Sequence, residues 1–212
     1  MKRAFKYRFY PSDVQAAELS RTFGRVRLVY SKALDERTRA DALEQPRASA
    51  EYTRSGFRYR DGRLSLAKMV EPLDIVWSRP LPEGAEPSTV TVSRDAADRW
   101  FVSLLVEDTV DILPTTESAV GIDAGITSLV TLSTGEKVAN PRHERVDRKR
   151  LAKAQRNLAR KVKGSENRVK ARVRVARVHA RIADRRRDHL HRLSTRVIRE
   201  NQTAVRPDPR ER

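Results

Sequence analysis

The chain has 212 residues, and 38% of them are hydrophobic, which is enough for a modest core. No apolar run approaches the roughly 20 residues that a membrane-spanning helix needs, and the first residues lack a signal-peptide core, so we expect a soluble, cytoplasmic protein. The chain has no cysteine, which excludes disulfides and cysteine-bound zinc.

The formal net charge of +17 is concentrated in one segment. Residues 141–200 hold 22 Lys and Arg against 6 Asp and Glu, a net charge of +16. Subtracting these from the totals of 45 and 28 leaves 23 basic and 22 acidic residues elsewhere, a net charge of +1. This placement predicts a dedicated element that binds DNA or RNA near the nucleoid. The alternative is a solvated arginine-rich helix without a partner, and no pattern indicates an oligomeric state.

The first predicted element is a strand over residues 2–10, where aromatic and basic side chains alternate with a period of two. The alternation places the aromatic rings in a sheet core and turns Lys6 and Arg8 outward. Stacking on nucleic-acid bases is the alternative for these rings and for Trp77 and Trp100.

Two helices are expected next. Ser12 and Gln15 have the spacing of a capping box, and the first helix should end at Gly24, which interrupts the apolar pattern. A second helix should then continue to about Leu43. This arrangement is compatible with a helix-turn-helix, although any helical hairpin has the same spacing.

Residues 45–53 have no periodicity and are predicted to be a linker. Short strands are expected after it, joined by turns at Asp61-Gly62 and at residues 95–98; they cover residues 56–60, 64–67, 73–77, 88–93 and 100–106. With the first strand they predict a small antiparallel sheet or barrel. We therefore expect an N-terminal nucleic-acid-binding domain over residues 1–110.

A second domain is expected over residues 118–203, so the predicted fold class is α+β. It opens with a strand and a glycine bend at 119–126, followed by a hairpin that turns at Thr134-Gly135. Residues 147–200 then show helical periodicity with a break at residues 164–167, which predicts a long antiparallel helical hairpin with arginines outward. Residues 204–212 are expected to form a disordered tail.

Asp123 is the candidate catalytic and metal-binding residue. It follows an apolar strand between two glycines that would allow close approach of a ligand or of backbone; an aspartate that bonds its own turn has the same signature. A two-metal nuclease needs several converging carboxylates, and Asp123 supplies one. Among the four histidines, His179, His189 and His191 lie among arginines, where a helical-surface or core-edge role is favoured over metal ligation.

Several stretches, in this order, resemble the OrfB/TnpB proteins of bacterial insertion sequences. The resemblance covers most of residues 1–203 and is carried by residues 6–11 with Gln15, 23–33, 90–93 with 100–103, 121–125, 140–142 and 163–167.

The resemblance implies a helix-turn-helix and a wedge-like barrel, followed by a RuvC-type, RNase H-like nuclease domain that a transposon-encoded RNA guides. Asp123 then matches the first catalytic aspartate, a ligand of Mg²⁺. Phosphate contacts would supply affinity and guide pairing would supply sequence choice. The candidate nucleic-acid contacts are Lys6, Arg8, Arg25, Arg27, Arg148, Lys149, Arg156, Arg160, Lys163, Arg168, Arg172 and Arg181.

The chain departs from the family pattern in three places. A long helical insert is nearly absent between Gln45 and Thr53. After Gln202 the family continues into a strand that ends in a second catalytic acid, whereas this chain turns to Thr203-Ala-Val-Arg-Pro. The zinc element and the third catalytic aspartate would lie further on. One of three catalytic acids is therefore retained, and we expect a partial RuvC-like domain.

Three functional hypotheses follow. The first is a nuclease-deficient nucleic-acid binder. The second is an active Mg²⁺-dependent, RNA-guided endonuclease or transposition protein whose site a partner completes. The third is a fragment of an actin-like ATPase, because Gly121-Ile-Asp-Ala-Gly-Ile also resembles the first phosphate loop of those enzymes, but no second phosphate loop or adenosine motif accompanies it.

Overall fold

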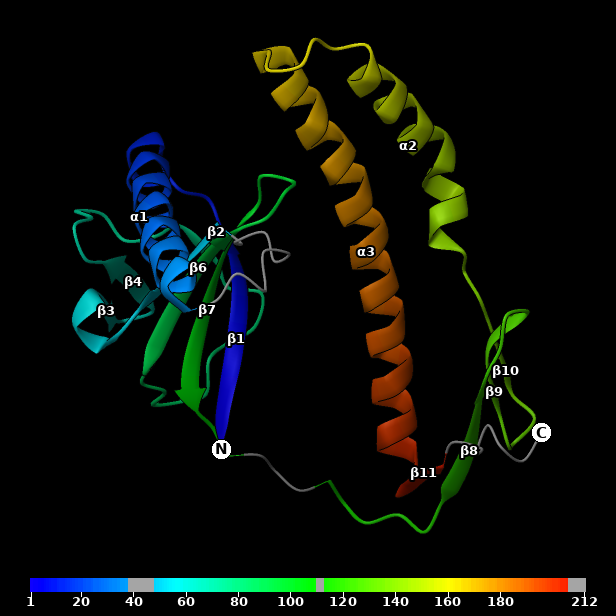
Figure 1. Cartoon of the computed structure of the whole chain (residues 1–212). Helices are drawn as coiled ribbons and strands as arrows, with labels where there is room; N and C mark the ends of the chain where they lie inside the picture. The colour runs from blue at the N-terminus through cyan, green and yellow to red at the C-terminus, as the bar shows by residue number, and fades with distance from the viewer. Residues whose placement is uncertain (38–47, 110–112, 206–212) are drawn as a thin grey trace. The chain divides into compact units, whose positions relative to one another are not determined.

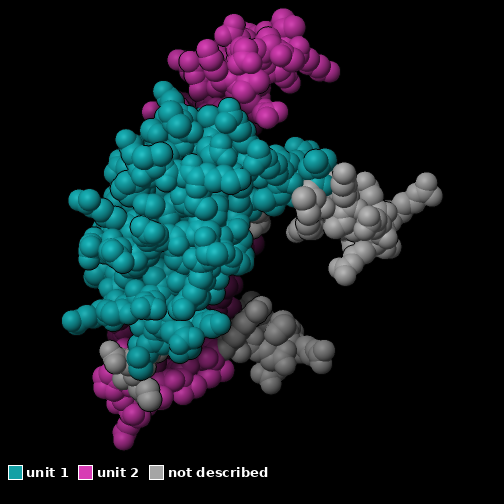
Figure 2. Space-filling model, turned by 90° about the vertical axis from the view of Figure 1, so that its left-hand side faces the viewer, with its two compact units in different colours: residues 1–110 teal, residues 111–212 magenta. Residues whose placement is uncertain are grey.

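The computed structural model describes residues 1–37, 48–109 and 113–205, and for residues 29–37 the backbone alone (Figure 1). The chain divides into two compact units, Met1–Val110 and Asp111–Arg212, which Figure 2 distinguishes by colour. Each unit is considered by itself. The predicted end of the second helix at Leu43 and most of the predicted tail lie outside the described residues.

Unit 1 is built on a five-stranded antiparallel sheet with the strand order β2-β6-β7-β1-β5, and a separate two-stranded sheet pairs β3 with β4. The strands are β1 (Lys2–Phe9), β2 (Ala48–Tyr52), β3 (Phe57–Arg60), β4 (Arg63–Leu66), β5 (Ile75–Val76), β6 (Thr89–Arg94) and β7 (Trp100–Glu107). No pairing between described residues joins β2 to β5, so the sheet is open and the expected barrel is not closed by hydrogen bonds.

The core of unit 1 forms on one face of β1, as the alternation predicts. Phe5, Tyr7 and Phe9 are buried, and burial raises the pKa of the Tyr7 hydroxyl. Trp100 lies opposite Phe9 in the register of β1 and β7, and its ring stacks on Phe23 at 5.7 Å. The core-packing interpretation of these rings is therefore confirmed.

Trp77, which directly follows β5, is more exposed than the buried rings of Phe5, Tyr7, Phe9 and Trp100. It keeps 37% of its surface exposed while its ring meets Tyr7 edge-on at 4.8 Å.

The turn between β3 and β4 forms where the sequence predicts it, since Asp61 and Gly62 both have positive φ, at 51° and 72°.

The expectation of a linker at residues 45–53 is wrong for its described part, because β2 occupies Ala48–Tyr52. This strand pairs with β6 in full register, and Ala50 is buried opposite Val92. Its five residues, Ala-Ser-Ala-Glu-Tyr, carry too little apolar alternation to indicate a strand. Pairing along the edge of β6 creates the strand, which a local pattern cannot report.

The predicted helix break at Gly24 is also wrong. Helix α1 runs unbroken over Asp13–Arg37. The capping box is confirmed, because Ser12 and Gln15 exchange backbone-to-side-chain hydrogen bonds of 3.1 and 3.3 Å. A single glycine inside a helix costs only about 1 kcal/mol. Buried Leu19 and Phe23 anchor the turns before Gly24, and the helix continues past the glycine.

Unit 2 contains a four-stranded sheet in the order β10-β9-β8-β11. Its strands are β8 (Ala119–Ala124), β9 (Ser128–Leu132), β10 (Lys137–Ala139) and β11 (Thr203–Val205). The first three are antiparallel, whereas β11 pairs with β8 in parallel, with Thr203 opposite Ala119 and Val205 opposite Gly121. Residues 204 and 205 are therefore strand and not disordered tail, because the β8 edge offers free backbone partners.

The helical hairpin joins β10 to β11 and consists of α2 (His143–Ala159) and α3 (Glu166–Glu200), which run antiparallel (Figure 1). The predicted break is confirmed: Gly164 has φ 83°, and the Ser165 side chain caps α3 by accepting from Arg168 N. Helix α2 starts four residues before the predicted position and ends at Ala159, which leaves Val162 76% exposed. No helix in the described residues is both long and apolar enough to cross a membrane.

Asp147 connects the two helices. It lies on α2 and is only 5% exposed, while Arg185 of α3 donates to its carboxylate at 2.9 Å. Arg181 and Arg150 lie at 3.9 Å from the same carboxylate. A carboxylate shared by three guanidinium groups offsets part of the repulsion that the basic hairpin generates.

We predict that Gly24→Ala stabilises unit 1 by roughly 0.5–1 kcal/mol, because alanine is the better residue in a helix interior and no atom lies within 4 Å of an added Cβ. Urea unfolding followed by tryptophan fluorescence measures this, since both tryptophans lie in unit 1. Gly62→Ala is the matched control and should destabilise, because Gly62 has φ 72°. A loss of stability in Gly24→Ala would favour a turn at Gly24.

We predict that Asp147→Asn destabilises the hairpin by about 1–3 kcal/mol. The value lies below that for a fully buried pair, because its arginine partners keep 37–59% of their side chains exposed. Asp188→Asn makes the same charge change at an exposed pair with Arg192 and should cost at most about 0.5 kcal/mol. Urea unfolding followed by circular dichroism at the helical band measures both. Equal effects of the two variants would contradict a special role for Asp147.

Candidate nucleic-acid interface

Asp123 lies near the end of β8, opposite Thr131 of β9. Val120 and Ile122 on the same strand pack toward Val197 of α3. Because side chains alternate across a strand, Asp123 is on the sheet face opposite to the one that α3 covers. Its side chain is half-buried.

The two glycines beside Asp123 are approached by the chain itself. Gly121 N donates a 2.9 Å hydrogen bond to Ser133 Oγ, and a Cβ on Gly121 would lie 3.2 Å from Ser133 Cβ. A Cβ on Gly125 would lie 3.0 Å from the Ser128 carbonyl oxygen. These contacts explain both glycines without a ligand.

The side chains around Asp123 do not fit a two-metal centre. In the part of the chain that the structure describes, no group of three or more His, Asp or Glu side chains could hold a metal ion. A pair of Mg²⁺ ions needs several converging carboxylates.

Two of the predicted contact residues on the hairpin have structural partners. Arg168 Nη1 donates to the carbonyl oxygens of Leu158 at 3.2 Å and Lys161 at 3.0 Å, so it caps the end of α2. Arg181 faces Asp147 at 3.9 Å. These two arginines stabilise the hairpin and are less available to phosphates than the prediction assumed.

The other predicted cations of the hairpin are exposed and, among the described residues, their side chains form no ion pair or hydrogen bond. They are Arg148, Lys149, Arg156, Arg160, Lys163 and Arg172. Because no carboxylate of the described residues pairs with these side chains, their positive charge is available to an external anion. All lie on α2, on the loop that follows it or on the first turns of α3, so the free charge concentrates toward the hairpin tip and α2.

The predicted cations of unit 1 are also exposed. Lys6 Nζ lies over the Phe101 ring at 4.4 Å, and the guanidinium of Arg8 lies over Tyr10 at 5.1 Å. Arg25 and Arg27 project from α1 after Gly24. Cation–π contacts with these rings orient the Lys6 and Arg8 side chains.

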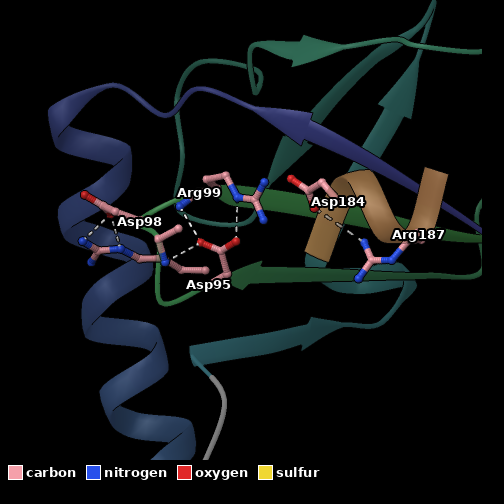
Figure 3. A network of polar contacts seen from close by, with 7 residues as sticks. Asp95, Asp98, Arg99, Asp184 and Arg187 are labelled. Carbon is pink, nitrogen blue, oxygen red and sulfur yellow. Dashed lines mark hydrogen bonds and ion pairs between the residues drawn. The ribbon is translucent and has the colours of Figure 1, made fainter. Parts of the chain in front are cut away.

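Other arginines of unit 1 are held in local ion pairs. At the turn between β6 and β7, Asp95 accepts from Arg99 Nε at 2.7 Å and from the backbone nitrogens of Ala97 and Arg99 at 2.9 Å (Figure 3). Arg94 Nε donates to Asp98 at 2.6 Å. These arginines stabilise the turn and carry little charge that a phosphate could use.

One side-chain cluster of unit 2 has no signal in the local sequence. His143 and His189 meet edge-on, with ring centroids 6.0 Å apart, beside a cavity that Arg148 also lines. The two histidines are 46 positions apart, so no local pattern could pair them. Only the antiparallel hairpin, which was predicted, brings the start of α2 next to the middle of α3.

Comparison with protein families gives two matches. An OrfB model described as "Probable transposase" matches residues 101–205. A helix-turn-helix domain model of the same OrfB type matches residues 1–44. The described part of that second match, residues 1–37, consists of β1 and the unbroken helix α1.

Two curated relatives cover different shares of the chain. A Streptomyces pristinaespiralis protein named "Putative RNA-guided DNA endonuclease" is 58% identical over 98% of this chain and 67% of its own length. An Escherichia coli (strain K12) protein named "Putative RNA-guided DNA endonuclease InsQ" is 38% identical over 56% of this chain and 30% of its own length. The first alignment spans 269 positions, at least 57 more than the 212 residues here (269 − 212), as an internal shortening requires. The chain therefore belongs to the OrfB family of transposon-encoded proteins.

Proposed function

We propose that this chain binds nucleic acid through its basic helical hairpin and does not cleave it by itself. One observation carries the proposal: exposed cations on α2 and at the hairpin tip lack internal carboxylate partners, in a segment of net charge +16. Phosphates neutralise such a surface and release counterions, which supplies affinity independent of sequence.

The N-terminal unit is proposed to add to this binding. Its family match is to a helix-turn-helix domain, and Arg25 and Arg27 are exposed on the helix that the match includes. DNA, RNA or a hybrid of the two would serve as ligand, because phosphate contacts alone do not distinguish them.

A guide RNA is part of the proposal because both curated relatives carry the name of an RNA-guided DNA endonuclease. In RNA-guided systems the protein holds the backbone of the heteroduplex and base pairing reads the sequence. The hairpin supplies the positive charge that such backbone contacts need. Unit 2, in which the C-terminal part of α3 packs on the β-sheet, is proposed to be a partial RuvC-like domain.

The second candidate function is an RNA-guided endonuclease that a partner completes. The position of Asp123, half-buried at the end of β8 on the face that α3 leaves uncovered, favours it. In that case Asp123 would supply one metal-binding carboxylate and the partner would supply the others.

We predict that Arg156→Gln with Arg160→Gln weakens binding to single-stranded RNA or duplex DNA roughly tenfold at low salt. The slope of log affinity against log salt should fall by about 1.4–1.8, because each lost phosphate contact removes about 0.7–0.9. Filter binding over a range of salt concentrations measures both quantities.

The matched control is Arg192→Gln with Arg196→Gln, which removes the same charge at the same spacing. Arg192 pairs with Asp188 at 3.1 Å. Arg196 donates to Glu136 at 2.7 Å, a hydrogen bond that raises the pKa of Arg196. This control should change the slope much less. Equal slopes for the two double variants would contradict binding through the unpaired cations.

We predict that the wild-type chain and Asp123→Ala both lack Mg²⁺-dependent cleavage of DNA and bind nucleic acid equally. The reason is that one carboxylate cannot hold a two-metal centre. A cleavage assay with labelled duplex DNA and co-purified RNA measures the outcome. Cleavage by wild type that Asp123→Ala abolishes would establish the endonuclease function instead.

A further inference from the structure

A cavity of about 500 Å³ lies within unit 2, where the loop before α2 and the first turns of α2 face the middle of α3. Its polar lining is mostly cationic and comes from both helices and from the loop. The side chains used below are Arg142, His143, Arg145, Arg148, Arg186 and His189.

The four arginines of this cavity are not neutralised from within. Among the described residues, none of their guanidinium groups forms an ion pair or a hydrogen bond. Glu144 is the one carboxylate in the lining. Four positive charges and one negative charge leave +3 before the histidines are considered, and that charge repels itself unless an anion enters.

The histidine pair supplies an independent indication of a ligand. The Nε2 atoms of His143 and His189 are buried, and neither has a hydrogen-bond partner in the described residues. Buried polar atoms in proteins are nearly always satisfied by protein, water or a bound group. Two unsatisfied ring nitrogens beside four free guanidinium groups suit the oxygens of a phosphate, which accept several charged hydrogen bonds at once.

The remaining wall of the cavity is apolar, formed by Leu129, Pro141 and Leu190. The volume falls in the range of sites that hold small organic molecules. A free inorganic ion would leave this wall without contact, whereas the sugar or base attached to a phosphate would cover it.

We propose that this cavity binds a phosphate group, held by the guanidinium groups of Arg142, Arg145, Arg148 and Arg186 beside the rings of His143 and His189. The expectation that nucleic acid supplies the phosphate rests on the proposed function. The phosphate is either a terminal phosphomonoester of a strand or an internal phosphodiester, and the experiment distinguishes these sources.

The test uses the full chain with its histidine rings labelled for NMR, because the four histidines provide their own control. Inorganic phosphate should shift the ring signals of His143 and His189 with saturation, and should leave those of His179 and His191 almost unchanged. In Arg148→Gln with Arg186→Gln, the phosphate concentration at half-saturation should rise roughly tenfold or more. Arg192→Gln with Arg196→Gln should leave it unchanged, and circular dichroism verifies that both variants fold.

A 5′-phosphorylated oligonucleotide and its 5′-hydroxyl counterpart then identify the source. Shifts of His143 and His189 with the phosphorylated strand alone support a terminal phosphomonoester, and equal shifts support an internal phosphodiester. If the oligonucleotide binds on filters without shifting the signals of these two histidines, the cavity is not the phosphate site, whereas the proposed function is retained. Shifts with inorganic phosphate but no oligonucleotide binding support the cavity and overturn the proposed function. Parallel, unsaturated shifts of all four histidines overturn the cavity as a site.

Discussion

The ion pairs of Asp147 are the interaction on which the hairpin of unit 2 depends. Two helices rich in arginine repel each other, and a buried carboxylate on α2 that receives Arg185 at 2.9 Å holds them together. Arg150 and Arg181 lie close enough to add to the same attraction. The carboxylate is inaccessible to water, so salt screens it less than it screens the exposed ion pairs elsewhere on α3.

Carboxylates also determine which arginines can act on a ligand. Along the second half of α3, Asp184, Asp188 and Glu136 each lie beside an arginine. The cations of α2 and of the hairpin tip, such as Arg156 and Arg160, have no such partners in the described structure. A hairpin of net charge +16 is therefore not uniformly available to phosphates. Its unpartnered cations among the described residues include those of α2, those of the connecting loop, Lys170, Arg172 and Arg174 on α3, and those around the cavity at the start of α2.

The sheet of unit 2 relates the chain to its longer relatives. The chain covers 67% and 30% of the two curated proteins it matches. Within it, β11 already pairs in parallel with β8 and ends opposite Gly121, two residues before Asp123. The fold thus positions Asp123 near the end of a strand. In the described residues, no group of metal-binding side chains forms around it. The proposed binding surface and Asp123 lie on different elements of unit 2, so variants can test binding and cleavage separately.

The sequence by itself determined the aromatic core of β1, the Asp61-Gly62 turn and the break between α2 and α3, because each depends on periodicity or turn chemistry within a few residues. The family followed from the resemblance of several stretches spread along the chain. Only the tertiary structure decided the rest. Strands β2 and β11 exist through pairing with β6 and β8, and α1 continues through Gly24 although the local pattern predicts a break there. The contacts of Asp147 and of the His143–His189 pair join residues about 40 positions apart, and such contacts leave no local signal.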